Sequence, residues 1–127
     1  KEEIMKVYLA GAINNRSDQE CKDWRNHIKE ILGEKNCLDP MRRDYRGKEL
    51  SCRWDIVEGD KQDIDNATHV LVYFDKPSVG TSMEILYAWQ KDIPVLVVVS
   101  ENASLSPWLV YHSQIFNSFE DALKYIA

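Results

Sequence analysis

Two continuous apolar runs, residues 69–74 and 94–99, place the tightest limit on what this chain can fold into. Both lack the in–out alternation of a half-exposed strand, and the second is rich in β-branched residues. Strands with this pattern are buried on both faces, as in a parallel sheet covered by helices. A helical pattern lies between the two runs, which fits a right-handed strand–helix–strand unit. The sequence therefore predicts an α/β fold built on a parallel sheet.

The rest of the chain continues this alternation. Ser17 and Glu20 form a capping-box pattern at the start of a first helix, which Gly33 ends. The buried face of this helix is expected to hold Trp24, Ile28 and either Ile31 or Leu32. Further strands are expected at residues 4–10, 36–39 and 114–116, further helices at residues 53–67, 81–91 and 119–126 (the last capped by Ser118), and a charged loop at residues 41–51. These elements predict one domain, residues 1–127, folded as a Rossmann-like three-layer sandwich with about five parallel strands.

Composition and charge argue against several classes of protein. The 127 residues carry a formal net charge of −5 without a basic block or stripe, which argues against a binder of nucleic acid polymers. No apolar run approaches the roughly 20 residues that span a bilayer, and no signal peptide precedes the first strand, so we expect no membrane partner and a cytoplasmic location. Cys21, Cys37 and Cys52 lack ligand spacing and are expected to be reduced thiols, not a zinc site.

The segment 75–84 is the strongest candidate for a ligand site. It follows a predicted buried strand, and open α/β sheets bind ligands beyond the carboxyl ends of their strands. A helix is expected to begin here, with Glu84 in its first turn. The hydroxyls of Ser78 and Thr81 and the backbone N–H groups of a helix N-terminus favour anions, and Gly80 permits close approach of a ligand. Neither the GxxxxGK[ST] nor the GxGxxG pattern is present, which argues against nucleoside triphosphate chemistry.

A second carboxylate is expected to face the same crevice. Asp60 falls between Val57 and Ile64 on the apolar stripe of the second predicted helix, where an unpaired carboxylate is costly. Asp60 and Glu84 can therefore converge from consecutive helices. Two alternatives stay open: Asp60 turns outward to solvent, or Glu84 only completes a capping box with Thr81.

Tyr8 and the loop after the first strand supply further polar groups. Tyr8 alternates with Val7 and Leu9, and a buried tyrosine hydroxyl needs a partner, which a crevice carboxylate would provide. Asn14 and Arg16 lie in the first strand–helix loop at the same edge, although an Asn-Asn pair is also ordinary turn chemistry. The histidines show no ligand spacing, and the sequence contains no nucleophile elbow.

Four pieces of the sequence, taken in order, are similar to those of one enzyme family. They are residues 7–12 (VYLAGA), Asp60 with Ile64 and Ala67, residues 77–84 (PSVGTSME) with Tyr87 and Ala88, and residues 105–108 (LSPW). With these pieces the chain resembles the nucleoside 2-deoxyribosyltransferase superfamily, which includes transferases, 2′-deoxynucleoside 5′-monophosphate N-glycosidases and cytidylate hydrolases. The resemblance implies a flavodoxin-like sheet, a nucleoside or nucleotide substrate, and a homodimer or higher homo-oligomer with shared active sites.

The same resemblance implies roles for individual residues. Glu84 would be the nucleophile that attacks the anomeric carbon, Asp60 would assist the base or the water, and Tyr8 would hold Glu84 in place. A carboxylate nucleophile divides N-glycoside cleavage into two steps, as in retaining glycosidases, and desolvation would separate the pKa values of the two carboxyls. The implied substrate-binding residues are Gly11, Ile13, Asn14, Arg16, Ser78, Gly80 and Ser106. No metal or organic cofactor is implied.

Ser78 bears on the choice of substrate within the family. At this position the nucleoside transferases carry an acid that binds the sugar 5′-hydroxyl, whereas the monophosphate glycosidases carry a serine that binds phosphate. A serine hydroxyl can donate to a phosphate dianion that an aspartate would repel. Ser106 matches a serine that reaches the phosphate from a neighbouring subunit. Asn14 departs from the glycosidase pattern, which has an arginine there, so Arg16 would have to substitute from a shifted position.

An N-glycosidase acting on a (2′-deoxy)ribonucleoside 5′-monophosphate is therefore the leading hypothesis. The close alternative is a 2-deoxyribosyltransferase that exchanges bases between deoxynucleosides. A non-catalytic nucleotide-binding module is an alternative of another class. Arg42, Arg43 and Asp44 are either base or phosphate contacts or, as the default expectation, members of a solvated charged loop.

Overall fold

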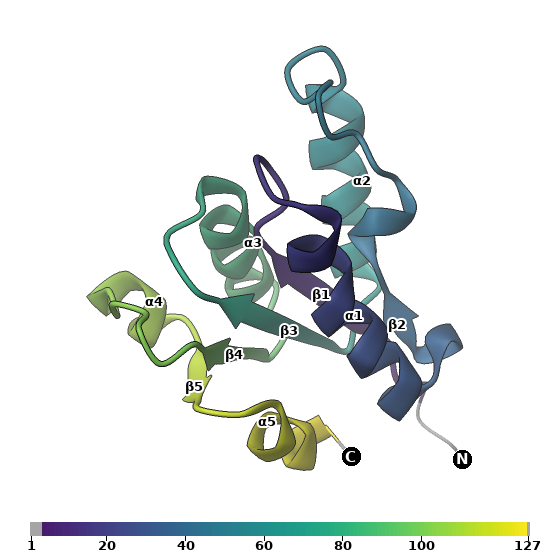
Figure 1. Cartoon of the computed structure of the whole chain (residues 1–127). Coiled ribbons are helices and arrows are strands. Elements are labelled where there is room, and N and C mark those ends of the chain that lie inside the picture. Colours follow the sequence, from purple (N-terminus) through teal and green to yellow (C-terminus); the bar gives the residue numbers. More distant parts are fainter. Residues whose placement is uncertain (1–3, 127) are drawn as a thin grey trace.

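A computed structural model describes residues 4–126 as a five-stranded parallel sheet with helices on both faces (Figure 1). The strands are β1 (Val7–Gly11), β2 (Cys37–Leu38), β3 (His69–Phe74), β4 (Val95–Val99) and β5 (Gln114–Phe116). They lie in the order β2-β1-β3-β4-β5, the doubly wound order of flavodoxin-like folds. The predicted fold class is confirmed. The direction of strand addition reverses between β1 and β3, so a ligand crevice is expected at the carboxyl ends of these two strands.

The two faces of β1 point into different layers of the molecule. The helices are α1 (Asp18–Leu32), α2 (Arg53–Asp65), α3 (Val79–Gln90), α4 (Pro107–Tyr111) and α5 (Phe119–Ile126), with short 3-10 turns η1 (Glu34–Asn36) and η2 (Pro40–Arg42). Val7 and Leu9 pack with residues of α1 and α5, whereas Tyr8 and Ala10 pack with residues of α2, α3 and α4. Tyr8 therefore faces the layer that also carries Asp60 and Glu84. Within residues 4–126, no helix has both the length and the apolar character needed to cross a membrane.

Capping residues identified in the sequence set several element boundaries. Ser17 Oγ accepts a hydrogen bond from the Glu20 N–H (3.1 Å), and the Glu20 carboxylate accepts one from the Ser17 N–H (3.0 Å), which completes the predicted capping box. Gly33 ends α1 with a φ of 95°, a left-handed conformation that favours glycine. Ser118 Oγ accepts from the Asp121 N–H (3.1 Å) at the start of α5. These boundary predictions are confirmed.

Other element boundaries differ from the prediction. β1 begins at Val7 and not at residue 4, because Lys6 exchanges hydrogen bonds with Thr68, outside the β1–β3 ladder. α2 ends at Asp65 and not at residue 67, since the Asn66 N–H already bonds back to the last helical carbonyls. Helix α4 has no counterpart in the prediction, because five residues are too few to show helical periodicity.

Of the apolar residues considered for buried helix faces, two are exposed. Ile31 of α1 is 52% exposed, and Leu32 takes the inward position instead. Val57 of α2 is 47% exposed, and it lies at the wall of a crevice instead of in the core. Ile64 therefore anchors α2 in the core, whereas the turn that carries Val57 and Asp60 lines the crevice.

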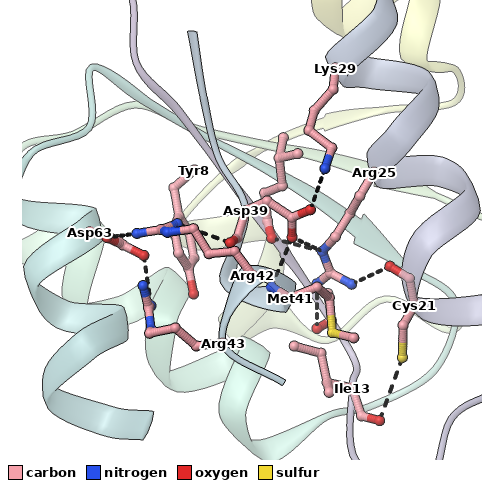
Figure 2. Close-up of polar contacts among 12 residues, drawn as sticks. Tyr8, Ile13, Cys21, Arg25, Lys29, Asp39, Met41, Arg42, Arg43 and Asp63 are labelled. Carbon is pink, nitrogen blue, oxygen red and sulfur yellow. Dashed lines mark hydrogen bonds and ion pairs between the residues drawn. The ribbon is translucent and has the colours of Figure 1, made fainter. Parts of the chain in front are cut away.

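A buried arginine fixes the end of β1 against α1 (Figure 2). Arg25 has no exposed surface, and its guanidinium donates to the carbonyls of Leu9 (3.2 Å), Gly11 (3.0 Å) and Cys21 (2.7 Å). Asp39, 3.7 Å from Arg25 Nε, supplies the opposite charge that a buried guanidinium needs. This arrangement positions the carboxyl end of β1, where Gly11 and the first strand–helix loop meet the crevice.

Candidate active site

A crevice of about 640 Å³ opens where β1 and β3 end. Its walls come from the first strand–helix loop, the loop between β2 and α2, helix α2, the loop between β3 and α3, and α3 as far as Tyr87. The volume is in the range of small-molecule sites, and the place is the switch point of the doubly wound sheet. The fold therefore puts the predicted site segments around one cavity.

Asp60 and Glu84 line this crevice, and the buried Tyr8 contacts Glu84 from the core. The fully buried Tyr8 donates its hydroxyl hydrogen to Glu84 Oε2, so the predicted partner of this hydroxyl is confirmed. The Asp60 and Glu84 carboxyl groups lie within hydrogen-bonding reach of each other. One strand and two consecutive helices thus bring a phenol and two carboxyls together.

Both alternative interpretations of the carboxylates are wrong. The Asp60 side chain is 22% exposed and lines the crevice, so it does not turn outward to solvent. Glu84 caps nothing, because α3 begins at Val79 and the cap is Ser78, whose Oγ accepts from the Thr81 N–H (3.4 Å). Glu84 therefore lies in the second turn of α3, not in the first as expected. Its position one turn deeper is what lets it reach Tyr8.

Burial and mutual repulsion perturb the protonation of the two carboxyls. Burial, and after it the charge of Asp60, raise the pKa of Glu84 to about 8, although the hydrogen bond from Tyr8 acts in the opposite direction. Burial also raises the pKa of Asp60, and the nearby Arg43 guanidinium opposes that shift. Two carboxyls this close titrate as a pair. The interaction between the two carboxyls lowers the pKa of Asp60 and raises that of Glu84, so it favours a proton on Glu84 and a charge on Asp60.

The first strand–helix loop forms the rim above β1. Ile13, Asn14 and Arg16 line the crevice, and Asn15 adopts a φ of 60°, as its turn chemistry allows. The Arg16 guanidinium donates to both oxygens of Asp75 (2.8 and 3.0 Å), and it also contacts Glu20. Gly11 also lines the crevice, but its lack of a side chain is required by Trp24: a Cβ would lie 2.9 Å from the indole.

The start of α3 presents small and polar groups to the cavity. Ser78 and Gly80 line it, and a Cβ built on Gly80 would meet no atom within 4 Å, so the backbone there is open to a ligand. Because Ser78 Oγ accepts a bond from Thr81, the serine hydroxyl hydrogen can still be donated elsewhere. Ser106 is not among the residues that line the crevice. It is exposed at the N-cap of α4, where its Oγ accepts from the Trp108 N–H.

Several residues of the crevice were not identified from the sequence. They are Tyr45, Arg46, Glu49, Lys61 and Lys76, which the described part of the chain brings to the wall. Lys76 had a usable signal, because it precedes Ser78 by two residues in the segment already singled out. Arg43 also lines the cavity and pairs with Asp60 and Asp63, so the solvated-loop expectation is wrong for this residue. Within residues 4–126, no three His, Cys, Asp or Glu side chains are placed to hold a metal ion.

A family model matches most of the chain. The model for "Nucleoside 2-deoxyribosyltransferase like" proteins matches residues 4–103, and the chain belongs to this family. It is accordingly an enzyme of a superfamily whose members act on nucleosides or nucleotides, by transfer or by cleavage of the N-glycosidic bond.

Two solved structures are similar to the chain in fold. A 2-deoxyribosyltransferase from Bacillus psychrosaccharolyticus has a TM-score of 0.74 at 14% sequence identity, over 92% of this chain and 89% of that chain. The CMP N-glycosidase of Clostridium botulinum has a TM-score of 0.57 at 19% identity, over 94% of this chain and 96% of that chain. A search of curated protein sequences finds no match.

Replacing Glu84 with glutamine should change how folding stability depends on pH. Since the Glu84 pKa is raised in the folded chain, ionisation favours the unfolded chain. Wild-type stability should therefore fall between about pH 4.5 and pH 8, by at most about 1.4 kcal/mol per pH unit. Glu84→Gln cannot ionise and should gain stability relative to wild type over this interval, as measured by urea unfolding. Glu58→Gln, an exposed change on α2, should follow wild type. A stability difference between Glu84→Gln and wild type that does not vary with pH would contradict the raised pKa.

Proposed function

We propose that this enzyme hydrolyses the N-glycosidic bond of a (2′-deoxy)ribonucleoside 5′-monophosphate and releases the free base and the sugar phosphate. The observation that carries the proposal is the meeting of Asp60 and Glu84 in one crevice, with Tyr8 bonded to Glu84. A pair of carboxyls with separated proton affinities supplies a nucleophile and an acid from like side chains.

In the first step, the Glu84 carboxylate attacks C1′ of the sugar. The C1′–N bond breaks, and its electron pair goes to the departing base. The proton that Asp60 and Glu84 share moves onto Asp60 as Glu84 attacks, and Asp60 then donates it to the base nitrogen. This step leaves a glycosyl ester on Glu84, a charged Asp60 and a neutral base.

In the second step, a water molecule attacks C1′ from the side that the base has left. Asp60 removes a proton from the water, the C1′–O bond to Glu84 breaks, and the electron pair returns to the Glu84 carboxylate. The hydrogen bond from Tyr8 stabilises the negative charge that reappears on Glu84. The pair again holds one proton, so the cycle closes without any other reagent.

The charge of the crevice supports an anionic substrate. Five of the residues that line it are cationic and three are acidic, although the chain as a whole has a formal charge of −5. The cationic residues are Arg16, Arg43 and Arg46, each of which is ion-paired with carboxylates, together with Lys61 and Lys76. Ser78 can donate its hydroxyl hydrogen beside the N-terminus of α3, a position that favours a phosphate. Because Asp75 and Glu20 already neutralise Arg16, we assign the 5′-phosphate to the Ser78 side of the crevice.

We also propose that the active enzyme is a homodimer or higher oligomer in which Ser106 of a neighbouring copy approaches the phosphate. Ser106 is exposed, and so are Trp108 (74%) and Tyr111 (70%) on the helix that it caps. Large exposed aromatic side chains that lie together are typical of protein interfaces. Sedimentation of the enzyme as a single chain would contradict this assembly.

The reaction is tested by incubating the protein with deoxynucleoside 5′-monophosphates and with deoxynucleosides, with and without an acceptor base. We expect free base from the monophosphates without acceptor. Glu84→Ala should lower the rate by roughly three orders of magnitude or more, whereas Glu58→Ala, on the exposed face of α2, should retain it. New nucleoside formed only with acceptor base would instead identify a 2-deoxyribosyltransferase. Thermal stabilisation by nucleotide without released base would identify a nucleotide-binding module.

Ser78→Asp should shift the substrate preference away from phosphate. An aspartate there repels a phosphate dianion and can accept a hydrogen bond from a 5′-hydroxyl. We expect kcat/KM for the monophosphate to fall by about 10- to 100-fold relative to the nucleoside, corresponding to one unfavourable charge contact. Ser78→Asn is the matched uncharged control and should lose much less. Equal losses with both substrates would place the phosphate elsewhere.

A further inference from the structure

Arg43 lines the crevice, but the two-step reaction gives it no role. It lies in the loop between η2 and α2, and its Nη2 donates to Asp63 Oδ2 (2.7 Å) and to Asp60 Oδ1 (3.3 Å). A single guanidinium therefore bridges two carboxylates that lie three residues apart on one face of α2. One of the two is half of the catalytic pair.

Asp63 holds Arg43 independently of Asp60. The Asp63 side chain is buried, and its two oxygens bind different arginines: Oδ1 accepts from Arg42 (2.7 Å) and Oδ2 from Arg43 (2.7 Å). Figure 2 shows both arginines converging on this carboxylate. Loss of either arginine would leave part of the buried Asp63 charge uncompensated, which is costly. Asp63 therefore holds the Arg43 guanidinium in a fixed position. The guanidinium of Arg43 is thus placed by its neighbour before any substrate arrives.

Gly59 provides the surface on which the guanidinium lies. A Cβ at this position would be 3.1 Å from Arg43 Nε, closer than most Cβ contacts, and 3.4 Å from its Cζ and Nη2, so Arg43 would have to move by a few tenths of an ångström. Glycine in a helix interior is unfavourable relative to alanine, and its φ here lies outside the left-handed region where glycine is favoured. Conformation therefore does not account for Gly59, whereas the close approach of Arg43 does.

Charged or titratable side chains face Asp60 from each element packed around it. Arg43 faces it from the loop, Glu84 from α3, Tyr8 from β1 and Asp63 from its own helix, with Lys61 at the crevice wall. Arg43, 3.3 Å away, and the hydrogen bond with Glu84 both lower the pKa of Asp60 and favour its charged form, whereas the charge of Asp63 raises that pKa. Burial is the largest influence on the pKa of Asp60 and raises it, and the Arg43 guanidinium is the largest influence that opposes this rise.

We propose that Arg43 is a positioning residue, which lies across Gly59, is anchored by Asp63, and fixes the orientation and the charge of Asp60 opposite Glu84. This inference rests on the proposed function, in which Asp60 relays the proton of the pair to the base. With Arg43 in place, Asp60 gives that proton up readily, and its oxygen points toward the base and not toward solvent. No group of Arg43 needs to touch the reacting atoms.

The test compares Arg43→Gln, Arg43→Lys and Gly59→Ala with wild type, by the pH profile of kcat/KM and by separate kcat and KM values. Loss of a cation makes the proton bind more tightly to the pair, so both limbs of the profile should move to higher pH in Arg43→Gln. We expect kcat to fall by about 10- to 100-fold with KM changed by less than about threefold, corresponding to a misplaced acid. Arg43→Lys should restore the limbs but only part of kcat. Gly59→Ala, which displaces Arg43 without removing its charge, should shift both in the direction of Arg43→Gln.

Arg53→Gln is the matched control, because it removes the same charge from the exposed start of α2, where Arg53 donates to the Leu50 carbonyl. The limbs of its kcat/KM pH profile, and its kcat, should equal those of wild type. A rise in KM in Arg43→Gln with unchanged limbs would overturn the proposal and make Arg43 a substrate contact. Unchanged kinetics in both Arg43→Gln and Gly59→Ala would also overturn it.

A second readout separates failure of this inference from failure of the proposed function. Carboxyl ¹³C NMR titration of Asp60 and Glu84 requires no turnover. If the wild-type enzyme released no base, the proposed function would fail, but the titration midpoints of the pair should still rise in Arg43→Gln. Coincident midpoints in wild type and Arg43→Gln would overturn the positioning role in either case.

Discussion

The burial of the Glu84 carboxyl against the Tyr8 hydroxyl is the contact on which the rest of the site depends. A carboxyl inside a protein is tolerated only where hydrogen bonds and neighbouring charges compensate for lost water. Here the compensation comes from β1 through Tyr8 and from α2 through Asp60. One strand and two helices therefore meet at the Glu84 carboxyl. Its burial there is the main reason that its pKa is raised.

Two arginines frame this contact from opposite sides of the sheet edge. Arg25 is buried behind β1 and donates hydrogen bonds to the Leu9 and Gly11 carbonyls. These bonds fix the backbone of the strand that carries Tyr8. Arg43 lies in the loop between η2 and α2 and binds Asp60 from that loop. Each guanidinium is itself held by a buried carboxylate, Asp39 or Asp63. The reactive pair is thus rigid because its supports are ion-paired, and preorganisation of this kind is what electrostatic catalysis requires.

Local patterns in the sequence predicted the layers of the fold and much of the crevice. The buried strand at residues 69–74 and the capping box at Ser17 depend on neighbours in the chain, so they can be recognised without a structure. Tyr8 and its carboxylate partner followed from the rule that a buried hydroxyl needs an acceptor. The bridge from Arg43 to Asp63 joins residues 20 apart across an irregular loop, and no periodicity reports such a contact. The cap at Ser78 was missed because Thr81 offered an equally good pattern three residues later.

The central claim, that Glu84 forms a covalent bond to the sugar, is tested most directly by trapping the intermediate. A 2′-fluoro-arabinosyl nucleoside 5′-monophosphate with a reactive leaving base should trap the intermediate, because fluorine slows both steps by destabilising the positive charge on the sugar ring, whereas the reactive base keeps the first step the faster of the two. Mass spectrometry of the digested protein should then find the fluorinated sugar phosphate on the peptide that contains Glu84, with one base released for each adduct. An adduct on Asp60, or steady release of base from the natural substrate without any trapped enzyme, would contradict the account.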